Sequence, residues 1–325
     1  MAPDDITGLT QLAELLRPSK RYAEILELTR KALEKAPDNT TVHLLLTEAL
    51  LREGHKEEGV TEAEKLAKTS LDGMVLNDIA WHLADTDTDL PFAQDCATKA
   101  VSIVENETSQ VSLSTLTNQD LRRVYDLSAA WDTLGWAYFR SGDLNNAKTY
   151  IDASWRLDQR GDVADHLGQI YERQGDTAAA MHTWRLALAA NSKLDETRER
   201  LRKAEKSMEP PEPSKQAAGR RVPAPQTPVE ELNKLRTVPI PELPKQEATA
   251  EFFLLFSPGK LEDIQFISGS EKLKSAIPVL MKTHFDAPFP DKGPEKIARR
   301  GILSCSTYTS PSCQLVFLLP SNTTK

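Results

Sequence analysis

Two stretches of the chain match one another at a spacing of 33 residues. The first reads Trp131-Asp-Thr-Leu-Gly-Trp-Ala-Tyr-Phe-Arg-Ser-Gly-Asp143, and the second reads Ala164-Asp-His-Leu-Gly-Gln-Ile-Tyr-Glu-Arg-Gln-Gly-Asp176. The positions that coincide are Leu134 and Leu167, Gly135 and Gly168, Tyr138 and Tyr171, Gly142 and Gly175, Asp143 and Asp176, and Ala147 and Ala180. A repeat of this length predicts helix pairs that bury their apolar faces on one another in a stack.

The pattern resembles the tetratricopeptide repeat (TPR), whose unit is a Trp-x-x-Leu-Gly-x-x-Tyr helix, a turn with glycine, and a second helix with small residues. The reason for the pattern is steric. Gly135 and Gly168 let two helices approach closely, and the tyrosines that follow fill the space opposite. The resemblance implies an all-α solenoid.

Weaker copies extend this array to residues 6–206, with about five repeats. The upstream copies are expected at 6–39, at 40–73, and at about 74–104, where the turn at Asp85–Pro91 is lengthened. Residues 105–127 interrupt the period, and we expect a loop followed by a short helix that packs over the solenoid. A charged cap helix is expected at 193–206, because a solenoid needs a polar end where the stacking stops.

TPR proteins bind extended peptides on the concave side, which the first helix of each pair lines. The register places nine residues there: Asn77, Trp81, Asp132, Trp136, Phe139, Arg140, Asp165, Gln169 and Arg173. Trp136, Phe139 and Arg140 share one helical face by their spacing, and aromatic residues and arginine dominate binding hot spots. Trp81 and Trp136 have a second interpretation, as core residues that pack against the next helix pair or the insertion.

The second part of the chain differs in composition. Nine of the twenty prolines lie between Pro210 and Pro244, so residues 207–247 are expected to form a semi-rigid, extended linker with one or two helical turns at 229–236. Residues 248–320 predict a small α+β domain with the order ββαββ. Its strands are expected at 250–256, 261–267, 300–308 and 313–319, and its helix at about 271–284, where Pro278 kinks or shortens it.

This domain resembles the C-terminal family of TonB-like proteins through the run Gly259-Lys-Leu-x-Asp-Ile-x-Phe-Ile-Ser-Gly269, Leu273, and a Phe-x-x-Pro element at Phe285–Pro288. That family binds an extended segment of an outer-membrane receptor by strand addition. The whole chain is also similar to the C-terminal part of bacterial envelope proteins in which a transglutaminase-like domain precedes TPRs. The catalytic part of that architecture is not in this sequence.

The residues with reactive side chains predict little chemistry. Cys305 and Cys313 become a cross-strand pair if the last two strands form a hairpin centred near Thr309, and either a disulfide or two buried thiols would fit. The six histidines lack metal-site spacing, and we expect no metal and no cofactor. No nucleophile–base–acid set is present, and the acidic run Asp85-Thr-Asp-Thr-Asp89 is expected to be a solvated turn rather than a calcium loop.

Charge and hydropathy limit the classes of partner. Residues 1–209 carry a net charge of −11 and residues 210–325 carry +3, which argues against nucleic acid. The longest apolar run, Phe252–Phe256, is far shorter than the roughly 20 residues of a membrane span, so no transmembrane segment is expected. The N-terminus lacks the basic and apolar segments of a signal peptide.

The sequence therefore predicts a non-enzymatic scaffold that binds a protein or peptide in the TPR groove, with a second interaction module at the C-terminus. Two alternatives stay open: an accessory, substrate-positioning segment of a transglutaminase-like hydrolase whose catalytic domain lies upstream, and an envelope component that binds outer-membrane partners by strand addition. The location follows from the start of the chain: cell envelope or periplasm for part of a longer exported protein, cytoplasm if Met1 is the native start. The sequence does not determine the oligomeric state.

Overall fold

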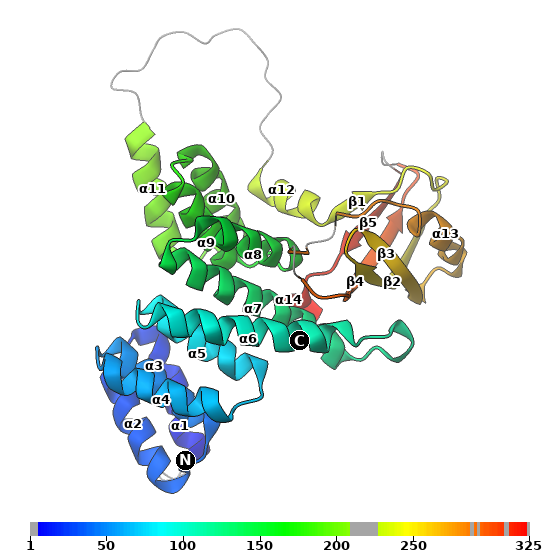
Figure 1. Ribbon diagram of the computed structural model, residues 1–325. Coiled ribbons are helices and arrows are strands. Elements are labelled where there is room, and N and C mark those ends of the chain that lie inside the picture. The colour runs from blue at the N-terminus through cyan, green and yellow to red at the C-terminus, as the bar shows by residue number, and fades with distance from the viewer. Residues whose placement is uncertain (1–5, 209–226, 287–288, 291–292, 309–311, 324–325) are drawn as a thin grey trace, which may run out of the picture. The chain divides into compact units, whose positions relative to one another are not determined.

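A computed structural model describes residues 6–208, 227–286, 289–290, 293–308 and 312–323 (Figure 1). The chain divides into two compact units. Unit 1 comprises Met1–Val104 and Ala129–Ala147, and unit 2 comprises Glu105–Ser128 and Lys148–Lys325. Both units contain helix pairs of the repeat, and the sheet belongs to unit 2.

Helix pairs fill the chain up to residue 208, and a small antiparallel sheet follows, which confirms the predicted fold class. The helical elements are α1 (Ile6–Leu16), η1 (Arg17–Ser19), α2 (Tyr22–Lys35), α3 (Thr40–Arg52), α4 (Lys56–Thr69), α5 (Gly73–Asp85), α6 (Leu90–Ser109), η2 (Leu113–Thr115), α7 (Asn118–Ser141), α8 (Leu144–Leu157), α9 (Gly161–Arg173), α10 (Thr177–Ala190) and α11 (Asp195–Met208).

The repeat residues start and stop these helices as their chemistry predicts. Asp72 and Asp176 are N-caps of α5 and α10, where their side chains accept hydrogen bonds from Met74 N (2.8 Å) and Ala179 N (2.9 Å). Gly142 and Gly175 follow α7 and α9 with φ of 89° and 82°, a left-handed conformation that glycine adopts without steric cost.

Gly168 shows why the repeat needs a small residue in its first helix. A Cβ atom there would lie 2.3 Å from Nε1 of Trp184, a side chain with no exposed surface. The indole of α10 therefore packs directly on the backbone of α9, and Ala180 on the same helix is also fully buried.

The insertion at 105–127 differs from its predicted form. α6 continues to Ser109, and α7 runs without a break from Asn118 to Ser141, so the expected short helix is the beginning of the next repeat helix. The apolar residues Leu121 and Val124 continue the helical period of the repeat, which explains the continuity. The remaining segment packs on the sheet rather than over the solenoid.

Contacts between that segment and the sheet form a small apolar cluster in unit 2. Val111 and Leu113 pack with Leu255 and Ala298, and the half-buried Phe253 lies against the same cluster. This face of the sheet is therefore covered by the η2 segment.

Residues 227–247 of the predicted linker are folded. Residues 209–226 lie outside the described residues, whereas α12 (Pro228–Leu235) forms the expected helical turns with a capping box between Thr227 and Glu230. Residues 237–247 are instead part of the folded domain, because Ile240 and Leu243 are buried in its core. Prolines do not prevent this, since they are tolerated in an edge strand and at a helix start.

The sheet has the order β1-β5-β4-β2-β3, and all its neighbours are antiparallel (Figure 1). Its strands are β1 (Thr237–Pro239), β2 (Ala248–Ser257), β3 (Lys260–Gly269), β4 (Ile297–Cys305) and β5 (Cys313–Phe317). β2 to β5 with the helix between them match the predicted ββαββ order, and β1 adds a fifth strand from the linker.

The predicted helix at 271–284 is shorter and divided into η3 (Glu271–Ala276) and α13 (Ile277–Leu280). Pro278 lies in the first turn of α13, where its missing N–H is not needed, and it cannot continue the preceding helical turn. Leu273 and Leu280 from this segment cover the core face of the sheet, with Phe252 below them. A short helix, α14 (Pro320–Thr323), follows the sheet.

Candidate functional site

The nine residues predicted to line the groove fall into two clusters. One cluster belongs to unit 1, on α5 and the second half of α7: Asn77, Trp81, Asp132, Trp136, Phe139 and Arg140. The other belongs to unit 2, on α9: Asp165, Gln169 and Arg173.

The three rings of the first cluster lie together but differ in exposure. Trp136 stacks on Phe139 with ring centroids 4.9 Å apart, and its centroid lies 6.4 Å from that of Trp81. Trp136 and Phe139 are only 5% and 8% exposed, whereas Trp81 is half-buried. Trp81 is thus the ring of this cluster with surface left for a partner.

Arg140 joins this aromatic cluster to the end of α5. Its guanidinium carbon lies 5.8 Å from the Trp136 ring centroid. Its Nη1 donates a hydrogen bond to the Asp85 carbonyl oxygen (3.2 Å), and its Nη2 lies 3.4 Å from Oδ1 of Asp87. The side chain of Asp85 in turn pairs with Arg52 of α3.

Arg52, Asp85 and Arg140 therefore form a row of alternating charge across α3, α5 and α7, the first helices of three successive repeats. We call these three residues the charged row. Their side chains are 26%, 25% and 23% exposed. Sequence reasoning found only Arg140, although the spacing of 33 residues between Arg52 and Asp85 carries the same repeat signal.

The acidic run after α5 is a turn stabilised by a neighbouring helix. Nζ of Lys56 donates hydrogen bonds to the carbonyl oxygens of Thr86 (3.3 Å) and Asp87 (3.1 Å). Asp87 and Asp89 have positive φ of 54° and 38°, which acidic residues tolerate better than most others. The carbonyl groups of this turn are thus bound by Lys56 and Arg140.

Three titratable groups on α3 and α5, the helices that hold Arg52 and Asp85, have shifted pKa values. Burial raises the pKa of Glu48, whose carboxylate lies 2.8 Å from Nε of Arg17, and raises the pKa of Asp78 to about 6. Burial also lowers the pKa of His82 to about 3, with Arg17 and Arg52 adding to the shift. At neutral pH the imidazole of His82 is therefore uncharged.

Asn77 and Asp132 are 6% and 3% exposed, so they belong to the packed side of their helices. The amide of Asn77 donates a hydrogen bond to Oδ1 of Asp78 (3.3 Å). Both residues are therefore packed within unit 1 and present little surface to a partner.

The cap helix contacts one residue of the cluster in unit 2, Asp165. Oδ2 of Asp165 accepts a hydrogen bond from Gln169 (2.8 Å) and one from Arg200 of α11 (2.9 Å). Arg173, at the end of α9, is exposed. The cap helix, predicted at 193–206 and observed at Asp195–Met208, thus covers the carboxylate that the repeat pattern placed in the groove.

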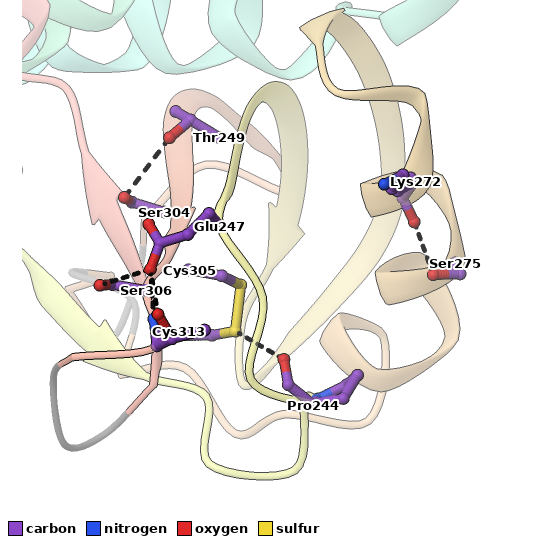
Figure 2. The surroundings of a disulfide bond; sticks show 10 residues. Pro244, Glu247, Thr249, Lys272, Ser275, Ser304, Cys305, Ser306 and Cys313 are labelled. Atoms are coloured by element: carbon purple, nitrogen blue, oxygen red, sulfur yellow. Dashed lines mark hydrogen bonds between the residues drawn. A yellow bond between two sulfur atoms is a disulfide. The ribbon is translucent and has the colours of Figure 1, made fainter.

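Cys305 and Cys313 are opposite one another on β4 and β5, and the structure joins their Sγ atoms in a disulfide (Figure 2). Glu247 holds the segment that follows β4, since its Oε1 accepts hydrogen bonds from Ser306 Oγ (3.1 Å) and Thr307 N (2.5 Å). Cys96 is a buried free thiol in α6, and burial raises its pKa to about 11.

The described residues lack a cluster of metal ligands and a helix suited to crossing a membrane. No group of three or more His, Cys, Asp and Glu side chains in them is arranged to hold a metal ion. Within the same ranges, no helix combines the length and apolar character that a membrane crossing requires.

Residues 128–160 match the model of the tetratricopeptide repeat, a protein-interaction repeat. The match covers the second half of α7 and all of α8, the pair that contains Trp136 and Arg140. A search of curated proteins found no match.

Several solved TPR proteins are similar in fold at low sequence identity. A thermophilic TPR protein of Thermus thermophilus is 18% identical, with a TM-score of 0.47 over 62% of this chain and 98% of its own. PilF of Pseudomonas aeruginosa is 19% identical, with a TM-score of 0.42 over 62% and 89%. YrrB, described as a TPR protein with an unusual peptide-binding site, is 16% identical, with a TM-score of 0.37 over 62% and 94%.

Proposed function

We propose that this protein is a non-enzymatic interaction scaffold, and that the charged row with Trp81 binds an extended segment of a partner protein. The observation that carries the proposal is the row itself: three partly exposed charges of alternating sign on the first helices of three successive repeats, beside a half-buried tryptophan. TPR proteins bind their partners through these helices.

The chemistry of the row suggests what the partner presents. Arg140 contacts the Trp136 ring and donates a hydrogen bond to the carbonyl oxygen at the end of α5. Its guanidinium is therefore ordered before a partner binds. An acidic side chain of the partner would meet this guanidinium, and an apolar side chain next to it would cover Trp81. Ordered arginines and tryptophans are the residue types that dominate binding energy at interfaces.

The sheet of unit 2 is the second interaction module in this proposal. Its similarity to the TonB-like family, and the similarity of the chain to envelope proteins with a transglutaminase-like domain, are the reasons to propose a bacterial envelope as the location. In a bacterial envelope, the scaffold would bind one protein and position it for another protein of the envelope.

The test begins with selection of binding peptides from a displayed random library on the full chain. The selected peptides are then titrated against Trp81→Ala/Arg140→Ala and against Lys99→Ala, whose side chain is 61% exposed on α6 of the same unit. We expect the double variant to bind at least tenfold more weakly and Lys99→Ala to bind within twofold of the natural chain. Equal affinity of the double variant, with its melting temperature retained, would contradict the proposal.

A further inference from the structure

Unit 2 contains a cavity of about 520 Å³ that has no part in the proposed groove. Side chains from α8, α9, α10 and α12 line it together with side chains from β1, β4 and β5. Its volume is within the range of pockets that bind small molecules or the end of a peptide. Trp155, Leu167, Leu186 and Phe317 are among the apolar residues of its walls.

Arg299 of β4 is the buried charge of this cavity. It is 8% exposed, and its guanidinium carbon lies 4.4 Å from the ring centroid of Phe317. Nη2 donates a hydrogen bond to the Leu157 carbonyl oxygen (3.3 Å), while Nε has no hydrogen-bond partner among the described residues. Within the same residues no carboxylate lies at ion-pair distance from this guanidinium.

Burial lowers the pKa of Arg299 to about 10, and the charge of Asp158 opposes the shift. Asp158 lies beyond ion-pair distance; its Oδ1 accepts a hydrogen bond from Ser321 Oγ (2.8 Å), and its Oδ2 is buried with no hydrogen-bond partner among the described residues. The guanidinium is therefore desolvated while it stays charged at neutral pH. Such a group is costly to bury unless a counter-ion binds it.

Two pairs of opposite charges line the cavity, and a further lining residue, Asp152, has no ion pair among the described residues. Arg156 pairs with Asp286, and Nε2 of His182 lies 3.0 Å from Oε1 of Glu231. Burial raises the pKa of Asp152, with Arg156 and Lys148 acting in the opposite direction. Asp286 and His182 are 79% and 53% exposed, so these pairs lie toward solvent, whereas Arg299 is buried.

We propose that this cavity binds a carboxylate group attached to a compact apolar body, with Arg299 as the carboxylate-binding residue. A carboxylate accepts hydrogen bonds from a guanidinium and would compensate the buried charge. The apolar body would lie against Trp155 and Leu167. Two sources have this chemistry: the C-terminal residue of a peptide and a free apolar carboxylic acid.

Arg299 also has a structural contact, and the test has to separate it from ligand binding. The Leu157 carbonyl ends α8, where the helix dipole favours a cation, so Arg299 ties β4 to that helix. That contact uses Nη2 alone. A purely structural arginine would bind no carboxylate and would not distinguish an acid from its amide.

The experiment uses the full chain and calorimetric titration with three probes: acetyl-glycyl-leucine, the same dipeptide with a C-terminal amide, and octanoate. In parallel, the ¹⁵N resonance of the Arg299 Nε–H, assigned by its loss in Arg299→Met, is followed during each titration. We expect at least one acid to bind, the amide to bind at least tenfold more weakly than its acid, and the Nε resonance to shift only with an acid. The tighter of the two acids identifies the source of the carboxylate.

Arg300→Met is the matched control, because Arg300 is the next residue on β4 and pairs with Glu251. We expect Arg299→Met to lose acid binding at least tenfold and Arg300→Met to retain it. The Trp81→Ala/Arg140→Ala variant should also retain it, which separates this site from the proposed groove. Failure of both acids to bind, equal binding of acid and amide, or an unchanged affinity in folded Arg299→Met would overturn the proposal. If Arg299→Met does not fold, the acid–amide comparison on the natural chain still decides the outcome.

Discussion

The surroundings of Arg140 in unit 1 and of Arg299 in unit 2 are alike in two contacts and differ in a third. Each guanidinium lies over an aromatic ring, at 5.8 Å from Trp136 and at 4.4 Å from Phe317. Each donates a hydrogen bond to the carbonyl oxygen of the last residue of a helix, Asp85 of α5 or Leu157 of α8. Arg140 also has a carboxylate, Asp87, at 3.4 Å, whereas Arg299 has none at ion-pair distance among the described residues.

We infer from this difference that one local arrangement could serve two purposes. In unit 1 the cation is partly exposed and neutralised by the chain itself, so it suits a binding surface that is stable when empty. In unit 2 the cation is desolvated and has no carboxylate at ion-pair distance within the described part of the chain, although the charge of Asp158 acts on it from beyond that distance. This is the physical reason to expect a general peptide surface in unit 1 and a specific anion in unit 2.

The largest expected effect concerns the rings beneath the two arginines. Trp136→Ala and Phe317→Ala should each lower the free energy of unfolding by about 3–5 kcal/mol, because both rings are buried. Urea denaturation measures the loss, and hydrogen exchange locates it in the unit that holds the ring. A loss below about 1 kcal/mol for Trp136→Ala would show that this indole is a contact surface rather than core.

The disulfide lies within unit 2, so its loss should destabilise that unit. Breaking the bond between Cys305 and Cys313 should lower the free energy of unfolding by about 2 kcal/mol, since it closes a short loop of sequence separation 8. Mass spectrometry after alkylation, with and without a reductant, measures whether the bond exists, and urea denaturation measures its effect. Alkylation of both thiols without a reductant would exclude the bond under those conditions.

Acid should affect unit 1 through two opposed groups. The folded pKa of His82, about 3, is below its ordinary value of 6.5, so between these pH values the unfolded chain binds more protons and stability is lost as pH falls. The folded pKa of Asp78, about 6, is above its ordinary value of 3.8, so between these values its contribution to stability is lost as pH rises. Between about pH 4 and 6 the two contributions oppose one another.

Single variants separate these contributions. Asp78→Asn should make the stability fall more steeply on acidification from about pH 6 to pH 4, by up to about 1.4 kcal/mol per pH unit relative to the natural chain. His82→Gln should change the slope in the opposite direction. Urea midpoints across this pH range measure both slopes. Parallel curves of stability against pH for the two variants would refute this account of Asp78 and His82.

The smallest expected effect tests the two arginines directly. Arg140→Met should lower the free energy of unfolding by about 1 kcal/mol, because it removes a satisfied, charged hydrogen bond. Arg299→Met should lower the stability of the ligand-free protein by less than Arg140→Met does, because the loss of its hydrogen bond to the Leu157 carbonyl is offset by the removal of a buried charge with no ion pair. Equal losses in the two variants, measured by urea denaturation, would remove the contrast on which the carboxylate site rests.

Much of the fold was predictable because its signals are local. Gly142 and Gly175 mark turns by their need for positive φ, and the apolar spacing of 250–256 and 261–267 predicted two strands with one turn between them. The insertion was harder. Leu121 and Val124 fit both a separate short helix and the first turns of α7, and only the packing of Val111 and Leu113 on the sheet shows where the segment belongs.

The sites were less predictable than the fold. Repeat position proposed Trp81 and Arg140 as groove residues but not Arg52 and Asp85, because a charge on a weak repeat resembles any solvated residue until its partner is known. No sequence pattern marked Arg299 as a candidate binding residue, since a basic residue in a strand ordinarily lies on the protein surface.

The sequence by itself determined that helix pairs come first, that a small sheet follows, and that Cys305 lies opposite Cys313 if the hairpin forms. These follow from periodicity, turn residues and strand register, which depend on neighbours along the chain. Only the tertiary structure decided that the end of the linker joins the sheet, that Trp136 is buried, and that Arg299 is buried with no carboxylate at ion-pair distance among the described residues. Burial and charge compensation depend on residues distant in sequence, such as Leu157 and Arg299, and no local pattern records which of them meet.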